Sequence, residues 1–268
     1  MRIMGMGHVA FAAALIALGI IGLIYGDFAV IWQPVPKALP FKEGLAYISA
    51  AIELAAGIGI LFSHTAALAS RVLLVFLVLW LLLLRSSGIF TAPLVELSWL
   101  SFGETAVIVA GGWALFTELS GQWGGAGIRF ATGASGLRAA RYLFAVALPM
   151  IGLSHIVYAT DTASYIPAWI PAHLFLAYFT GACHIAAGIG VFFGVFPRLA
   201  AALEALMLLI FTVFVWVPGI AGTSPDRLHW TAFTVSLLIS SGAWVVADSY
   251  HGAPWLAMPA VGKRKQPA

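Results

Sequence analysis

The chain has few charged residues and a single cysteine. Asp, Glu, Lys and Arg together make up 9% of its 268 residues, against roughly a quarter in soluble domains. Water is therefore not the solvent for most of its surface. Cys183 has no second cysteine with which to form an intramolecular disulfide, and no CxxC or Cys/His metal spacing occurs in the chain. These absences argue against redox chemistry through thiols.

Several cofactor-binding motifs are also missing. No helical stretch carries an HxxxH or ExxH pair, which is the spacing that metal sites on helices use, so we predict no metal site. The chain has no haem-ligand pair, flavin fingerprint or nucleotide-binding loop. If electrons pass through this protein, they must come from a partner or from a bound quinone.

Apolar residues make up 62% of the chain and form eight long stretches. Each is close to the roughly 20 residues that a helix needs to cross the hydrocarbon core of a bilayer. Strands are not expected, because a membrane barrel alternates apolar and polar residues, whereas Val72 to Leu84 is apolar at every position. The sequence predicts an all-α integral membrane protein whose first span is a retained helix and not a signal peptide. The eight stretches are 8–26, 44–62, 66–84, 97–116, 142–158, 172–193, 199–217 and 231–247.

The two halves of the sequence are related by a constant spacing of 131 residues. The run Ala55 to Gly59 returns unchanged as Ala186 to Gly190. Because four spans per unit is an even number, the repeats are expected to be parallel. We predict two four-helix bundles, 1–118 and 141–250, joined by a glycine-rich cytoplasmic linker, 119–140, and followed by a basic cytoplasmic tail, 251–268. Further identical pairs in this register are Pro36 and Pro167, Pro40 and Pro171, Tyr47 and Tyr178, Trp99 and Trp230, Phe102 and Phe233, and Trp113 and Trp244.

Basic residues are divided unevenly between the two sides of the predicted membrane. With the N-terminus inside, nine Lys and Arg fall in inner segments and four in outer segments. The positive-inside rule then predicts that both termini are cytoplasmic, and we expect a bacterial inner membrane. The tail should contact the anionic headgroups of the lipid bilayer and not nucleic acid. The inner residues are Arg2, Arg71, Arg129, Arg138, Arg141, Arg198, Lys263, Arg264 and Lys265, and the outer ones are Lys37, Lys42, Arg85 and Arg227.

Two outer loops in corresponding positions combine prolines with aromatic residues. Residues 27–42 read DFAVIWQPVPKALPFK, and residues 160–171 read TDTASYIPAWIP. Proline prevents either loop from continuing as a regular helix, and Trp and Tyr favour the membrane interface. Two interpretations remain open: a lid over a cavity that opens outward, and an interfacial segment that anchors the bundle.

Five ionisable residues inside the predicted spans are functional candidates, because charge is costly in hydrocarbon. Glu53 and His184 occupy equivalent positions 131 residues apart, and they could approach each other if the two halves face one another. His184 and Glu204 lie on neighbouring antiparallel helices at depths that differ by about 6 Å. We predict a hydrogen bond between them, in which the carboxylate fixes the imidazole tautomer. The alternative is that both only join helices by polar contacts worth about 0.6 to 2 kcal/mol. The remaining two candidates are Glu104 and His155.

A set of motifs in the second half is shared with a known family. The outer loop holds Tyr165, Pro167 and Pro171. The next span holds Tyr178, Gly181, His184 and Gly188, followed by Leu203 to Met207, Val217-Pro218, Trp230 and Gly242 to Trp244. Over about residues 141–248 this pattern resembles the DoxX-like membrane family. The first half is a more divergent copy, with Leu73 in place of Glu204.

The resemblance implies a family in which some members are subunits of quinone-reducing sulfur oxidoreductases, such as thiosulfate:quinone oxidoreductase. We therefore expect a membrane subunit or quinone-site component of an oxidoreductase that works with a redox partner subunit. His184 and Glu204 would take up or hand on a proton at a quinone carbonyl, and Tyr178 would donate a hydrogen bond. Two alternatives are a protein that binds or transports a lipophilic small molecule, and a scaffold without chemistry, and whether the chain is an enzyme is left open. The residues expected to contact the bound quinone are Glu53, His155 and Trp169.

Overall fold

The structure is a computed structural model that describes residues 5–120, 130–222 and 226–259. The regular elements in these ranges are all helices, which confirms the all-α prediction. The first half contains α1 (Met6–Tyr25), α2 (Lys42–Gly59), α3 (Ala66–Leu79), the π-helix η1 (Trp80–Arg85), α4 (Ser86–Thr91) and α5 (Glu96–Leu119). The second half contains α6 (Gly133–Val157), α7 (Ala159–Ser164), α8 (His173–Phe193), α9 (Pro197–Phe211), the π-helix η3 (Thr212–Trp216), α10 (Val217–Ala221) and α11 (Arg227–Asp248).

Proline and an unusual backbone conformation set the start of the second long helix in each half. Phe41 and Ala172 adopt left-handed φ angles of 55° and 58°, and each follows a proline, Pro40 or Pro171. α2 and α8 begin at the next residue. Because a proline cannot continue a preceding helix and the left-handed residue turns the chain sharply, both outer loops end in the same abrupt reversal.

Seven helices among the described residues are long and apolar enough to cross a membrane. They account for seven of the eight predicted spans. The eighth, predicted at 44–62, corresponds to α2, which carries three ionisable residues, Lys42, Glu43 and Glu53, within its 18 residues. That charge lowers its hydropathy below that of the other seven, although α2 packs along α1 as a full-length helix. The count of eight spans therefore stays a prediction.

The second half begins earlier than the sequence indicated. α6 starts at Gly133, nine residues before the predicted span at 142–158. Two arginines, Arg138 and Arg141, fall in its first turns and hide the start of the helix from a hydropathy criterion. The predicted linker 119–140 is therefore partly helical, and its residues 121–129 lie outside the described part of the chain. The described part of the predicted tail packs against the start of α9, where Arg198 donates to the carbonyl of Ala253.

Helix boundaries in the two halves recur at the 131-residue spacing. α2, α3 and α5 begin at residues 42, 66 and 96, and α8, α9 and α11 begin at 173, 197 and 227. The π-helical segments also correspond, at 80–85 and 212–216. In each half, the third long helical segment therefore changes from α- to π-helix and back. π-Helical turns are rare and often occur at functional sites.

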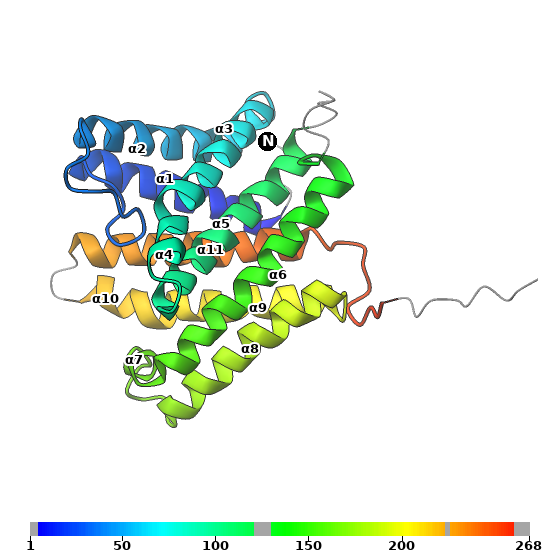
Figure 1. The fold of residues 1–268 in the computed structure, drawn as a ribbon. Helices are drawn as coiled ribbons and strands as arrows, with labels where there is room; N and C mark the ends of the chain where they lie inside the picture. The colour runs from blue at the N-terminus through cyan, green and yellow to red at the C-terminus, as the bar shows by residue number, and fades with distance from the viewer. Residues whose placement is uncertain (1–4, 121–129, 223–225, 260–268) are drawn as a thin grey trace, which may run out of the picture.

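The two halves are interleaved and share one hydrophobic core. α1 packs against α11, and α6 packs against α5, so the first helix of each half contacts the last helix of the other. α5 and α11 cross where Gly111 faces Gly242, and a Cβ added to Gly111 would lie only 2.5 Å from the Cα of Gly242. Figure 1 shows α2 and α3 at one edge of the molecule and α8 at the opposite edge, and it shows α4, α7, α10 and the loop before α2 gathered at one end. The two units predicted for 1–118 and 141–250 therefore pack directly against each other.

Candidate functional site

A buried polar contact joins α8 to α9 in the second half. His184 Nδ1 lies 2.6 Å from Glu204 Oε1, and neither side chain is exposed. The hydrogen bond that the sequence predicted between these two residues is therefore confirmed. A carboxylate in this position fixes the imidazole tautomer that carries its proton on Nδ1.

His155 of α6 lies against this pair. The His155 and His184 rings are edge to face, with centroids 4.9 Å apart. His155 Nδ1 is 2.9 Å from the hydroxyl oxygen of Thr180, which donates its own proton to the carbonyl of Leu176. The hydroxyl oxygen therefore accepts from His155, so the proton of the neutral His155 ring is on Nδ1. Phe211 closes another side, with its ring 5.7 Å from that of His155 and 6.0 Å from that of His184.

Two glycines allow α6 and α8 to approach closely enough for the histidines to meet. A Cβ added to Gly181 would lie 2.9 Å from the Cβ of His155, and one added to Gly152 would lie 3.0 Å from the Cβ of His184. Each added Cβ would also lie closer than 3.0 Å to the backbone carbonyl oxygen of the other glycine. Any larger residue at either position would push the two helices apart and separate the rings.

Two polar atoms of the pair have no hydrogen-bond partner among the described residues. They are Nε2 of His184 and Oε2 of Glu204, and both are buried. Buried polar atoms without partners are uncommon in native structures, and each costs about 1–3 kcal/mol. Both atoms can therefore bond to a polar group of a ligand without losing the contact between Nδ1 and Oε1.

The other residues predicted for this site lie on the surface of the helices. The side chain of Tyr178 is 47% exposed and that of Trp169 is 72% exposed. Trp169 packs against Phe214, and Tyr165 packs against Trp216, so loop 160–171 rests on η3 through aromatic contacts. Neither Tyr178 nor Trp169 is brought to the buried pair, and both remain predicted ligand contacts only.

The acidic candidates of the first half form a separate group. Glu53 accepts a hydrogen bond of 2.7 Å from the amide of Gln33, and Glu104 accepts one of 3.2 Å from the indole of Trp32. α2 and α8 lie at opposite edges of the molecule (Figure 1), so Glu53 does not meet His184. The approach considered from the 131-residue spacing is therefore not realised.

Several residues that make these contacts were not identified from the sequence. Thr180 and Phe211 in the second half, and Trp32 and Gln33 in the first, are neither charged nor part of a motif. The one available signal was Gln33, a polar amide in a loop whose neighbours are mostly apolar. The side chains of Trp32 and Gln33 are only 8% and 5% exposed, which loop residues rarely are.

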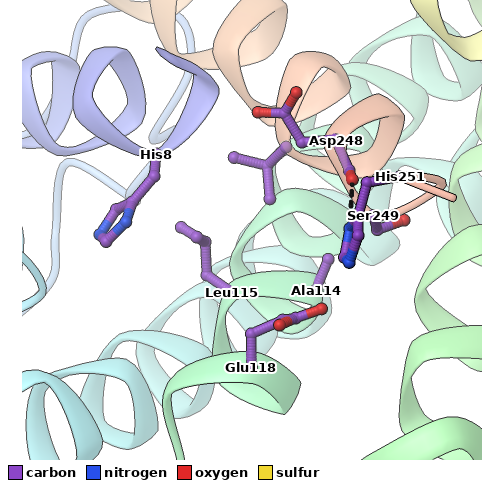
Figure 2. Close-up of a pocket in the computed structure, with 8 residues that line it drawn as sticks. His8, Ala114, Leu115, Glu118, Asp248, Ser249 and His251 are labelled. Atoms are coloured by element: carbon purple, nitrogen blue, oxygen red, sulfur yellow. Dashed lines mark hydrogen bonds between the residues drawn. The ribbon is translucent and has the colours of Figure 1, made fainter. Parts of the chain in front are cut away.

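A cavity of about 40 Å³ lies between α1, α5 and α11 at the other end of the molecule. Figure 2 shows His8, Glu118, Asp248 and His251 around it, with His251 bonded to the carbonyl oxygen of Asp248. His8 contacts the carbonyl of Ile60 at 2.9 Å. This volume can hold a few water molecules. Among the residues that the structure describes, no group of three or more His, Cys, Asp or Glu is arranged to hold a metal ion.

The long apolar helices and their buried polar pair define a helical integral membrane protein. Within it, residues 136–217 match the family model described as DoxX. The match covers most of α6 and all of α8, α9 and η3, and it includes His155, His184 and Glu204. The DoxX-like resemblance is therefore confirmed for this region. A comparison with curated proteins found no match, and a comparison with solved structures found none.

Proposed function

We propose that this membrane protein is the quinone-site component of a membrane oxidoreductase, with the site at the His184–Glu204 pair. The observation that carries the proposal is that the pair is fully buried while Nε2 of His184 and Oε2 of Glu204 lack partners. A ligand with an apolar body and a polar oxygen would satisfy these atoms among apolar and aromatic side chains such as Phe211. A quinone has this chemistry and is soluble in the bilayer.

In this proposal the pair handles protons while a redox partner subunit supplies the electrons. Reduction of a quinone to the quinol adds two electrons from the partner and one proton at each carbonyl oxygen. His184, when it carries a proton on both nitrogens, would donate its Nε2 proton to the nearer carbonyl oxygen, and water would supply the proton for the other carbonyl oxygen. Glu204 stabilises the imidazolium before the transfer and holds the neutral ring in the same orientation afterwards. Oε2 of Glu204 is free to accept a hydrogen bond from the quinol hydroxyl.

The proposal extends to the organisation of the whole chain. The first half is a second, diverged DoxX-like unit, which is supported by the 131-residue spacing between the starts of α2, α3 and α5 and those of α8, α9 and α11. Both termini are cytoplasmic in an inner membrane, as the nine-to-four division of Lys and Arg indicates. Only the second unit pairs a histidine with a glutamate, since Leu73 stands where Glu204 stands. We therefore propose one quinone site per chain.

Analysis of co-purified lipids tests the proposed function. The full chain is purified in mild detergent, and its organic extract is analysed by chromatography and mass spectrometry. We expect quinone in the extract of the unchanged protein and none with His184→Phe or Glu204→Gln. Ser236→Ala, which removes a neutral contact of 2.9 Å to Thr212 near the site, should keep it. Equal quinone in all four preparations would mean that the pair is not the site.

A second candidate function is the binding or transport of another lipophilic molecule. It is favoured by the exposed aromatic side chains of loop 160–171, where Trp169 packs against Phe214 of η3. In the same extracts, a stoichiometric lipid in place of quinone that disappears with Trp169→Ala would support this candidate. Quinone that persists in Trp169→Ala would support the redox role.

A further inference from the structure

The loop between α1 and α2, in the first half, carries a buried polar side chain, that of Gln33. Gln33 is 5% exposed and Glu53, on α2, is 2% exposed. Gln33 Nε2 donates to Glu53 Oε1 over 2.7 Å. The proposed quinone site lies in the other half, so this contact needs a separate explanation.

The orientation of the Gln33 amide is fixed by its other contacts. Its Oε1 accepts a hydrogen bond of 2.9 Å from the backbone N–H of Ala29, and its own backbone N–H donates to the carbonyl of Ala29. Because the amide oxygen is used in this way, the NH₂ group must point toward Glu53. Gln33 therefore offers Glu53 a neutral donor and no positive charge.

Glu53 also lacks an ionic partner. In the described residues, no nitrogen of Lys, Arg or His lies within 4.0 Å of its carboxyl group. A carboxylate buried without a cation is strongly disfavoured, and such groups take up a proton instead. Glu204 has the opposite surroundings, because His184 lies 2.6 Å away. Glu53 thus has only a neutral donor beside it, whereas Glu204 has a histidine.

A small cavity lies between Glu53 on α2 and the start of loop 27–42. Its volume is about 10 Å³, close to the space that one water molecule needs. Asp27 and Glu53 both line it, together with Gln33, Ser49 and apolar side chains of α1 and α2. Asp27 and Glu53 are the only ionisable residues in this lining, which consists of described residues. One small volume is therefore bordered by a partly exposed acid and a buried one.

Asp27 borders this cavity at its partly exposed side. It pairs with Lys42 at 2.8 Å and with Arg227 at 3.3 Å, and its side chain is 35% exposed. Burial tends to raise the pKa of the Asp27 carboxyl group, but hydrogen bonds from Lys42, the N–H of Phe28 and Arg227 outweigh it and hold the pKa below its ordinary value. Asp27 thus remains ionised and offers a carboxylate that can accept a proton beside the cavity.

We infer that Glu53 is a proton-binding site of the first half, loaded through the cavity that it shares with Asp27 and kept neutral by its burial without a cation. Binding converts the carboxylate and one proton into the acid, with no other reactant. The site is independent of the quinone role, since it uses none of the residues around His184. It gives the first half a chemical function of its own, although it lacks the histidine–glutamate pair.

Infrared spectroscopy of the full chain in lipid tests whether Glu53 holds a proton. Protonated carboxyl groups have a C=O band that is separate from those of carboxylates and amides. At neutral pH we expect Glu53→Gln, which keeps the shape of the side chain, to remove one acid band. Glu204→Gln should leave that band in place. If Glu53→Gln leaves the acid bands unchanged, the inference is wrong. A hydrophobic carbodiimide, which reacts with protonated carboxyl groups, gives an independent result on the unchanged protein, and absence of label at Glu53 would also overturn the inference.

The rate of deuterium exchange at the same band tests the route. Transfer to D₂O should shift the band, and Asp27→Asn should slow this shift several-fold. Lys42→Met is the matched control, because it breaks the same ion pair but keeps the Asp27 carboxylate. We expect exchange at least as fast as in the unchanged protein. An unchanged rate in Asp27→Asn, or equal slowing in both variants, would overturn the route through Asp27.

Discussion

Substitution of His184 and Glu204, singly and together, separates a functional ion pair from ordinary helix contacts. The 2.6 Å distance and the complete burial of both side chains mean that removing either one leaves the other uncompensated. Loss of one partner of a buried ion pair costs about 3–5 kcal/mol, whereas polar contacts between membrane helices average about 0.6 kcal/mol and reach about 1.7 kcal/mol.

We therefore expect His184→Phe and Glu204→Gln each to lower the free energy of unfolding by about 3 kcal/mol. The double variant should lose about the same amount and not the sum of about 6 kcal/mol, because the coupled contact can be lost only once. The assay is reversible unfolding in mixed micelles, followed by tryptophan fluorescence. Thr212→Val with Ser236→Ala forms the matched control, a neutral contact of 2.9 Å on neighbouring helices.

Additive effects would refute this reasoning. If the two single changes sum to the double within about 0.5 kcal/mol, the residues do not act as a unit. Their contact would then be one of the ordinary polar contacts between helices, and the scaffold hypothesis would describe the second half better. The reasoning would also be refuted if the coupling energy between Thr212 and Ser236 in the control were as large as that between His184 and Glu204.

Two further predictions concern topology and packing. Reporters fused after Arg71 and after Lys265 should both indicate the cytoplasm, and one within 160–165 should indicate the outside; an inverted result at any site would contradict the arrangement derived from the basic residues. Gly57→Leu and Gly188→Leu should both lower thermal stability in detergent, since an added Cβ already lies 2.9 Å from the Ile16 side chain in one case and 2.7 Å from the Ala145 carbonyl oxygen in the other. A silent change at one position would mean that the two halves do not share a packing scheme.

The features that depend on single positions in the sequence were largely predictable. Long apolar stretches define helices wherever hydrocarbon is the solvent, and the depths of His184 and Glu204 on adjacent helices follow from the constant rise per residue. Their hydrogen bond could therefore be predicted before any coordinates. The DoxX-like motif was also readable, because it rests on residue identities such as Tyr178, His184 and Gly188.

Features that depend on how helices cross were not predictable. Whether His155 reaches His184 depends on the close approach of α6 and α8 at Gly152 and Gly181, and glycine spacing does not say which helix will be the neighbour. The interleaving of the two halves has the same cause. The start of α6 was missed because arginines at the membrane boundary look like loop residues. The burial of Gln33 was missed because a loop that folds inward has no periodic pattern.

The most direct test of the account is quinone binding by the intact chain in lipid nanodiscs. Decylubiquinone and menadione serve as probes for the two common quinone classes, and bound quinone is quantified after removal of the free probe. The account predicts one saturable equivalent of one of these probes per chain, lost in His184→Phe and Glu204→Gln and kept in Ser236→Ala and in Glu53→Gln of the other half. No saturable binding of either probe, or binding that is unchanged in His184→Phe, would contradict it.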